Sequence, residues 1–318
     1  MPVRLGGIGV MGEDPSERLN PDVPTAFFAN RAARTGPESF GRYRPLLAAR
    51  LNLVEARVLE ARDLAAAVDA AWERGVRRVV VAGGDGTVSL AAQALIGRRA
   101  ALGVVPAGTG NTFFHGLGLP WGDELADCMA VGTVQPMDVG VAVADNGARV
   151  FLNSLTLGVS TLLAAAVDEP LKRRWGWWAW PLMLRVVFRR TPVFRVLVTT
   201  PGGQVSFRTR QLVVGNNPHL AGPIRAAAPC SAQDGALDVW ALGDGTLYQT
   251  ARALCALMTG TIADSPAVRF VQCTECRLET TPRMAVDIDG EIWRATPLTV
   301  RALKDALTVI AGTGDDVS

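Results

Sequence analysis

The chain has 318 residues, of which 49% are hydrophobic and 19% are charged, a composition typical of globular rather than disordered proteins. Its formal net charge is only +2, which argues against a general affinity for nucleic acid. The five scattered cysteines indicate a reducing compartment rather than a disulfide framework. We therefore expect a cytoplasmic globular protein with one large domain or two ordinary ones.

The first part of the chain alternates between predicted strands and predicted helices. Residues 1–24 lack a secretory pattern and are expected to form a loose tail. Strand–helix alternation from residue 25 onward predicts a parallel sheet with right-handed crossovers. The sequence thus predicts an α/β domain over residues 25–136. Its strands are expected at 25–29, 53–58, 76–82 and 101–105, and its helices at 38–50, 62–74 and 87–97.

A glycine cluster follows the third predicted strand directly and consists of Gly83, Gly84, Asp85, Gly86 and Thr87. The glycines leave backbone N–H groups open to an anion, and the following helix directs its positive N-terminus to the same place. A carboxylate at Asp85 would repel phosphate unless a cation lay between them, so we interpret it as linked to Mg²⁺. An ordinary glycine-rich turn is the alternative.

A second loop of the same kind follows the next predicted strand and contains Gly108, Thr109 and Asn111. Because the carboxyl ends of parallel strands share one edge of the sheet, we expect both loops to lie at that edge, where such sheets bind ligands. The chain has only two lysines, Lys172 and Lys304, and neither follows a glycine loop as a Walker A motif requires. Phosphate would therefore be held by backbone, hydroxyls, arginine or metal.

After Pro136 the sequence predicts short strands separated by turn residues, which indicates a mostly antiparallel domain over residues 137–300. Helical segments are expected at 161–190 and 246–260, and residues 301–318 are expected to return to the first domain. The strands are expected at 139–143, 150–157, 193–199, 205–209, 211–214, 237–242, 268–271, 277–281 and 285–288.

Residues 172–190 combine four tryptophans with six arginines and lysines. The apolar run within this segment would span about 15 Å as a helix, against roughly 30 Å for a bilayer core, so it cannot cross a membrane. Tryptophan flanked by basic residues suits the water–lipid interface. We expect either a peripheral contact with the inner face of the membrane or a buried helix.

The order and spacing of the motifs together resemble the diacylglycerol kinase catalytic family, which includes bacterial lipid kinases and, more distantly, sphingosine and ceramide kinases. The resemblance covers most of the chain from residue 25. It rests on Asn30, residues 83–88, 106–111, 117–120 and 138–140, Asn153, Gly158, and residues 213–216, 228–238 and 289–291.

The resemblance implies an enzyme that phosphorylates a lipid hydroxyl with ATP and Mg²⁺, in a cleft between an α/β domain like that of NAD kinase and a β-sandwich domain. It implies that Glu291 is the general base and that Asp85 organises metal and phosphates. Glu291 as a solvated turn residue and Asp234 as part of a plain Asp-Gly turn are the alternatives. The residues implied for ATP are Asn30, Gly83, Gly84, Asp85, Gly86, Thr87, Gly108, Thr109 and Asn111, and those implied for a structural Mg²⁺ are Ser231, Asp234 and Ala236.

Two positions depart from the family pattern. Thr112 stands where many members carry Asp, which leaves the acceptor open between diacylglycerol and a sphingoid or other long-chain alcohol. Val58 stands where a threonine near the nucleotide is common. An enzyme similar to NAD kinase and a lipid-binding homologue without turnover are the alternative functions. A homodimer is left open.

Overall fold

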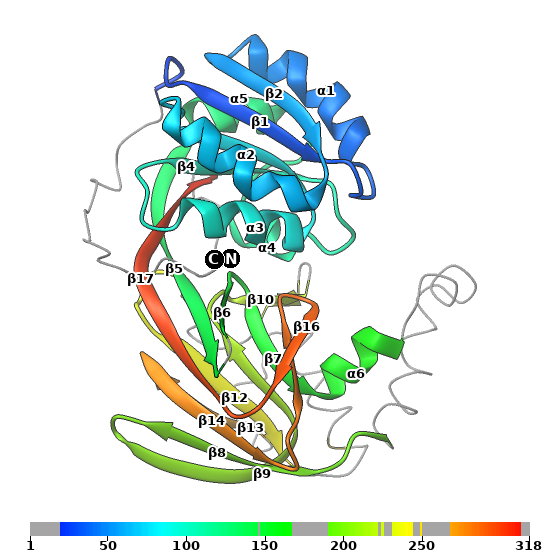
Figure 1. Cartoon of the computed structure of the whole chain (residues 1–318), viewed down its shortest axis with the longest axis vertical. Coiled ribbons are helices and arrows are strands. Elements are labelled where there is room, and N and C mark those ends of the chain that lie inside the picture. Colours follow the sequence, from blue (N-terminus) through cyan, green and yellow to red (C-terminus); the bar gives the residue numbers. More distant parts are fainter. Residues whose placement is uncertain are drawn as a thin grey trace.

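The computed structural model describes residues 20–145, 147–166, 190–221, 224–225, 231–243, 249 and 268–312. An α/β domain and a strand-rich domain lie one above the other in Figure 1. Two long strands, β5 (Thr133–Ala144) and β17 (Leu298–Ala311), pass from one to the other. The predicted fold class, a parallel α/β domain followed by a mostly antiparallel β-sandwich, is confirmed.

The parallel part of the sheet has the order β4-β3-β1-β2, and β17 pairs with β4 on its other side. Val79, Val80 and Val81 of β3 are at most 1% exposed, as expected for a parallel strand covered on both faces. The bounds are β1 (Thr25–Asn30), β2 (Leu53–Leu59), β3 (Arg78–Gly83) and β4 (Ala101–Pro106).

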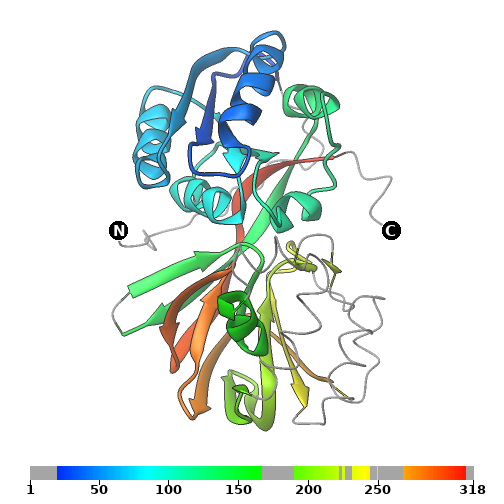
Figure 2. The ribbon, with the colours of Figure 1, turned by 90° about the vertical axis from the view of Figure 1, so that its right-hand side faces the viewer.

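Helices cover both faces of this sheet. Figure 2 shows α1 and α5 on one face and α2 and α3 on the other, and each pair is in contact. The short helix α4 follows the loop after β4. The bounds are α1 (Gly36–Ala48), α2 (Ala61–Glu73), α3 (Asp85–Leu95), α4 (Thr112–Gly116) and α5 (Glu124–Val131).

Helix α2 shows how the local sequence specifies these elements. Leu64, Val68 and Ala71 recur at helical spacing and are at most 2% exposed, so they form the face that packs on the sheet. The helix ends just before Gly75, whose φ of +89° is a conformation that glycine adopts without a steric penalty.

The second domain is built from antiparallel strands around a core that includes Phe151, Phe194 and Leu278. Helix α6 (Val159–Ala166) follows β7, and β10 (His219–Ala221) pairs with β11 (Ile224–Arg225) in a small separate sheet. The remaining bounds are β6 (Gly147–Phe151), β7 (Ser154–Gly158), β8 (Phe194–Thr200), β9 (Gly203–Gly215), β12 (Leu237–Gly243), β13 (Val268–Cys273), β14 (Glu275–Thr281), β15 (Ala285–Ile288) and β16 (Glu291–Ala295).

Strand β17 joins the two domains. Its first half pairs with β14 and β5, and its second half pairs with β5 and, in parallel, with β4. The register between β17 and β5 shifts between Leu303 and Leu307, where Asp305 has a φ of +51°. Since β5 begins at Thr133, the expected boundary near residue 136 falls inside a strand, and the domain limits stay a prediction.

The structure corrects several expected elements. The single strand expected at 150–157 is two strands, because the N–H groups of Leu152, Asn153 and Ser154 donate to the Asp289 carboxylate where the chain bends. The two strands expected at 205–209 and 211–214 are one continuous strand, β9. Where a break was expected, the pairing register between β9 and β12 shifts by one residue instead.

The first glycine loop is also shorter than expected. Helix α3 begins at Asp85 rather than at residue 87, so Asp85 and Gly86 belong to its first turn. Of the helix expected at 161–190, α6 accounts for the beginning, and residues 167–189 lie outside the described residues. The helix expected at 246–260 lies almost wholly outside them, as does most of the tail 1–24.

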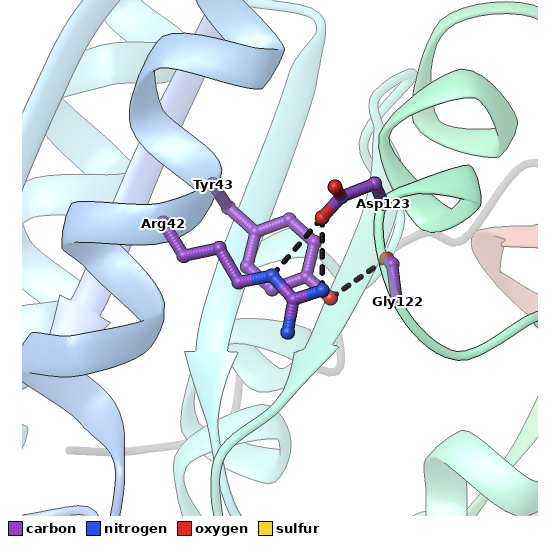
Figure 3. A network of polar contacts seen from close by, with 4 residues as sticks. All are labelled: Arg42, Tyr43, Gly122 and Asp123. Carbon is purple, nitrogen blue, oxygen red and sulfur yellow. Dashed lines mark hydrogen bonds and ion pairs between the residues drawn. The ribbon is translucent and has the colours of Figure 1, made fainter.

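A polar network fastens α1 to the loop before α5 (Figure 3). The Tyr43 hydroxyl donates a hydrogen bond of 2.9 Å to the Gly122 carbonyl, and Arg42 forms an ion pair with Asp123 at 2.9 Å. Burial raises the pKa of Tyr43. The tyrosine is therefore the enclosed member of the network, whereas the ion pair is exposed to solvent.

Candidate active site

The two glycine loops meet at the carboxyl ends of β3 and β4. These strands are parallel neighbours with Gly83 opposite Pro106, and the Ala107 N–H donates to the Gly83 carbonyl at 3.0 Å. A Cβ built on Gly108 would lie 2.4 Å from the Cα of Gly84. The loops thus touch backbone to backbone, a distance that only glycine at position 108 allows.

Helix α3 starts at this contact. Gly84 precedes its first residue in an extended conformation, and the Gly84 carbonyl accepts the Val88 N–H at 3.0 Å. The N–H groups of the first turn have no partner within a helix. The end of α3 therefore directs a positive dipole end and open donors toward the second loop, an arrangement that favours a bound anion.

Asn30 lies beside the first loop although 57 residues separate it from Thr87. It ends β1, and its Nδ2 donates to Thr87 Oγ1 at 2.8 Å while its Oδ1 accepts the Ala32 N–H at 3.0 Å. Thr87 is 6% exposed. Both side chains are thus engaged with the protein, and a direct contact of either with a nucleotide stays a prediction.

Asn111 closes the second loop. Its Oδ1 accepts the Gly108 N–H at 2.8 Å, and its Nδ2 donates to the Gly108 carbonyl at 3.2 Å. The residue has a left-handed backbone with φ +49°, which asparagine tolerates better than most residues. Thr109, at the tip of the loop, is exposed. The asparagine therefore shapes the loop, and Thr109 is its side chain most open to a ligand.

Asp85 connects the first loop to the helix that follows the second. Its Oδ1 accepts the Phe113 N–H at 2.8 Å, within the first turn of α4, so the carboxylate caps that helix. Its Oδ2 would lie 3.4 Å from a Cβ on Gly110. The structure thus gives Asp85 a structural partner on one oxygen and directs the other toward the second loop.

Glu291 reaches this site from the other domain. It is the first residue of β16, at the tip of the β15–β16 hairpin, which points toward α3 and α4 in Figure 1. A Cβ on Gly86 would lie 3.0 Å from Glu291 Oε1. Glu291, which is about 200 residues from the first glycine loop in the sequence, therefore lies directly against the first turn of α3.

Arg149 was not singled out from the sequence, and the structure places it beside Glu291. It lies on β6, and its guanidinium forms an ion pair and hydrogen bond with Glu291 Oε2. Its charge also lowers the pKa of Asp287, although burial, the larger effect, raises it. No sequence motif marks Arg149, because its role depends on how the β5–β6 and β15–β16 hairpins face each other.

Asp289 anchors the hairpin tip. Its carboxylate accepts the N–H groups of Leu152, Asn153 and Ser154 at 2.8–3.0 Å. Although part of the residue is exposed, protein encloses its carboxyl group, and this burial raises the pKa to about 6 against the opposing effect of the three N–H donors. The negative charge of Asp85 raises it further. The turn that presents Glu291 is therefore fixed by a carboxylate that itself lies near the glycine loops.

The residues expected to hold a structural Mg²⁺ lie elsewhere, between β5, β12 and β17. Asp234 Oδ1 accepts the Ala236 N–H at 2.9 Å, and its Oδ2 accepts from Gln272 at 3.1 Å. The buried Asp138 accepts from Gly235 and Asp305 at 2.6 and 2.8 Å, and burial raises its pKa. The glycine loops and this segment are thus two separate places.

The segment around Asp234 offers a metal one carboxylate and several main-chain oxygens. Within the described part of the chain, no three His, Cys, Asp or Glu side chains are grouped closely enough to hold a metal ion. A site at Asp234 would therefore depend on main-chain carbonyls, such as those of Ser231 and Ala236, and on water. Mg²⁺ prefers oxygen donors of this kind and commonly keeps several waters. The site stays a prediction.

Comparisons with known proteins agree with the geometry. Residues 24–142 match the family model described as the diacylglycerol kinase catalytic domain, and residues 154–311 match the model described as the YegS C-terminal NAD kinase beta sandwich-like domain. The chain belongs to the diacylglycerol kinase catalytic-domain family. The resemblance inferred from the motifs is thereby confirmed, and the chain is a member of a kinase family.

Relatives of this kinase family align along most of the chain. A diacylglycerol kinase of Mycobacterium tuberculosis is 26% identical over 270 residues, which cover 82% of this chain and 85% of that protein. A diacylglycerol kinase of Bacillus subtilis is 27% identical over 232 residues, covering 71% and 75%. A crystal structure of a candidate diacylglycerol kinase from Bacillus anthracis str. Sterne has a TM-score of 0.77 at 24% identity, covering 95% of this chain and 99% of that one.

The expected membrane contact lies in a part of the chain about which the structure says little. Apart from Arg190, the segment 172–190 lies outside the described residues. None of the helices in the described ranges combines the length and the hydropathy that a membrane span requires. The contact with a membrane surface stays a prediction.

Proposed function

We propose that this kinase transfers the γ-phosphoryl group of ATP to the hydroxyl group of a lipid. The observation that carries the proposal is the position of Glu291 Oε1, which would lie 3.0 Å from a Cβ on Gly86. A carboxylate from one domain thus lies against the helix N-terminus and glycine loops of the other. That arrangement suits a phosphate group held on one side and a base on the other.

The two loops would hold the triphosphate through backbone. Neither carries a lysine, so open N–H groups of the first turn of α3 and the exposed Thr109 at the tip of the second loop are the available donors. The contact between Gly84 and Gly108 would keep the two sets of donors at a constant spacing. This rigidity favours catalysis by positioning.

Glu291 would accept the proton of the lipid hydroxyl as its oxygen forms a bond to the γ-phosphorus. The bond from that phosphorus to the bridging oxygen of ATP breaks, and ADP leaves with the electron pair. The carboxylate is mostly exposed, with 59% of its side chain accessible, so an incoming hydroxyl can reach it. A general base of this kind typically contributes about 10²–10⁴ in rate.

Mg²⁺, when bound, would neutralise phosphate charge. Asp85 is the residue that we propose for it at the loops, because its Oδ2 is directed toward Gly110 while its Oδ1 caps α4. Ser231, Asp234 and Ala236 are proposed for a second, structural ion.

The lipid acceptor would approach from the strand-rich domain. Thr112, which departs from the common Asp of the family, is 8% exposed, so its hydroxyl lies inside the loop region rather than on the surface. We propose diacylglycerol or a similar long-chain alcohol as the acceptor class, with the protein acting peripherally at the inner face of the membrane. The segment 172–190 would make that contact. Replacing Trp177 and Trp178 with serine is expected to weaken binding to lipid vesicles while leaving ATP binding intact.

Radiolabelled ATP and a panel of diacylglycerol, sphingosine, phosphatidylglycerol and undecaprenol, with products separated by chromatography, test the proposal. We expect label on one lipid and a loss of at least about 100-fold in both Glu291→Gln and Asp85→Ala. Circular dichroism of both variants should show a folded protein. Label on NAD in a parallel reaction with NAD as the acceptor, together with no label on any lipid, would contradict the proposal, as would full activity in Glu291→Gln.

A further inference from the structure

Arg149 and Glu291 form a contact between two hairpins that are far apart in the sequence. Arg149 lies on β6, opposite Ala142 of β5, and Glu291 begins β16, 142 residues later. The Arg149 side chain is 30% exposed, whereas that of Glu291 is 59% exposed. The arginine is thus the more enclosed partner, and it holds the more exposed one.

The contact distinguishes the two oxygens of the Glu291 carboxylate. The guanidinium Nη2 of Arg149 donates to Oε2, and Oε1 is the oxygen that lies toward Gly86 and the first turn of α3. Arginine suits this task because its rigid, permanently charged fork gives a directional hydrogen bond. One oxygen is therefore anchored, and the other is presented to the glycine loops.

The surrounding charges make this anchor the main constraint on Glu291. Asp287 on β15 is an acidic neighbour of Glu291, and the negative charge of Glu291 adds to burial in raising the pKa of Asp287, so the two carboxylates repel each other. Arg149 is the cation that an ion pair in the described residues places against it. Without that cation, an exposed glutamate would occupy several rotamers.

An exposed ion pair contributes little to the stability of a folded protein. A misplacement of about 1 Å, in contrast, can reduce the rate of a reaction by about 10²-fold. The Arg149–Glu291 pair therefore matters for the position of the Glu291 carboxylate rather than for the free energy of unfolding.

We propose that Arg149 is a positioning residue that holds Glu291 with Oε1 toward the phosphate site. The inference rests on the proposed function, because it gives the arginine a role in preparing the base. It assigns no contact between Arg149 and substrate. Its effect should therefore appear in turnover and not in nucleotide affinity.

Kinase assays on Arg149→Gln and Arg149→Lys test this role, with Arg195→Gln as the matched control on an exposed position of β8. Arg149→Gln is expected to lower kcat by about 10–100-fold with KM for ATP within about twofold of the wild-type value. Arg149→Lys should recover part of the loss, since it restores the charge without the fork. The control should match the wild type, and all variants should keep the wild-type Tm.

Unchanged kcat in Arg149→Gln would overturn the proposal. So would an increased KM for ATP at unchanged kcat, because the arginine would then bind the nucleotide. Full activity in Glu291→Gln together with a loss in Arg149→Gln would overturn it as well, since the arginine would act on another group.

A second measurement does not depend on kinase activity. With glutamate labelled by ¹³C at the carboxyl carbon, the Glu291 signal is assigned by its absence in Glu291→Gln. We expect this signal to shift in Arg149→Gln and not in Arg195→Gln. An unshifted signal would show that the pair does not form and would overturn the inference, whereas an absence of lipid phosphorylation in the wild type would refute only the proposed function.

Discussion

The contact between the glycine loops can be broken by one methyl group. In Gly108→Ala the new Cβ would lie 2.4 Å from the Cα of Gly84 and 3.0 Å from Asn111 Oδ1. Carbon atoms in contact prefer about 3.5–4.0 Å, so the loops must separate by roughly 1 Å. The neighbouring atom belongs to the backbone between the end of β3 and the start of α3, which cannot rotate away as a side chain can.

The expected loss is larger in activity than in stability. Overpacking of this kind typically costs about 1–3 kcal/mol of unfolding free energy. A displacement of about 1 Å in a group that positions substrate can cost about 10²-fold in rate. We therefore expect Gly108→Ala to be folded with a lowered Tm, to bind ATP more weakly, and to phosphorylate lipid at least about 100-fold more slowly.

Isothermal titration with ATP, a lipid kinase assay and thermal unfolding measure the three quantities. Gly41→Ala is the matched control, because a Cβ at this exposed position in α1 meets nothing within 4 Å. It should keep full activity and gain up to about 1 kcal/mol from helix propensity. Wild-type affinity and activity in Gly108→Ala would refute the reasoning that the spacing of the two loops matters.

Two further predictions concern stability, both measured by urea denaturation. Because burial raises the pKa of Asp289 to about 6 in the folded protein, folding favours its protonated form. Stability relative to Asp289→Asn should fall by about 3 kcal/mol as the pH rises from about 3 to about 7, and parallel pH curves would contradict this. Tyr43→Phe removes the hydroxyl that donates to the Gly122 carbonyl and should cost about 1 kcal/mol, more than Arg42→Gln, whose ion pair is exposed; the reverse order would contradict the assignment.

The α/β domain could be predicted from the sequence because its signals are local. Apolar runs such as residues 79–82 indicate strands, and the glycines at 83, 84 and 108 indicate where strands end. Parallel strands place those ends at one edge of the sheet. The contact between Gly84 and Gly108 follows from this rule. The start of α3 at Asp85 did not follow, because glycine at 86 suggests a loop although the first turn of a helix tolerates it.

The strand-rich domain was harder to predict, since its strands depend on partners that are distant in the chain. The break between β6 and β7 arises from hydrogen bonds to Asp289, more than 130 residues away. The continuity of β9 depends on a register shift opposite β12. The strand propensities of the local sequence predict neither the break nor the register shift.

The candidate site could likewise be predicted only where its signals are local in the sequence. Glu291 was placed in it by resemblance to a kinase family and not by any spacing, because no local rule relates residue 291 to residue 86. Arg149 was missed, since an arginine in a strand has no signature until the facing hairpin is known. Its contact with Glu291 is a property of tertiary structure alone.

The central claim is that two lysine-free loops hold a triphosphate while Glu291 faces it from the other domain. A crystal structure of the protein with Mg²⁺ and a non-hydrolysable ATP analogue tests it most directly. We expect phosphate oxygens against residues 84–87 and 108–111, with the terminal phosphate nearest Glu291. Phosphates bound away from these loops, or a terminal phosphate out of reach of Glu291, would contradict it.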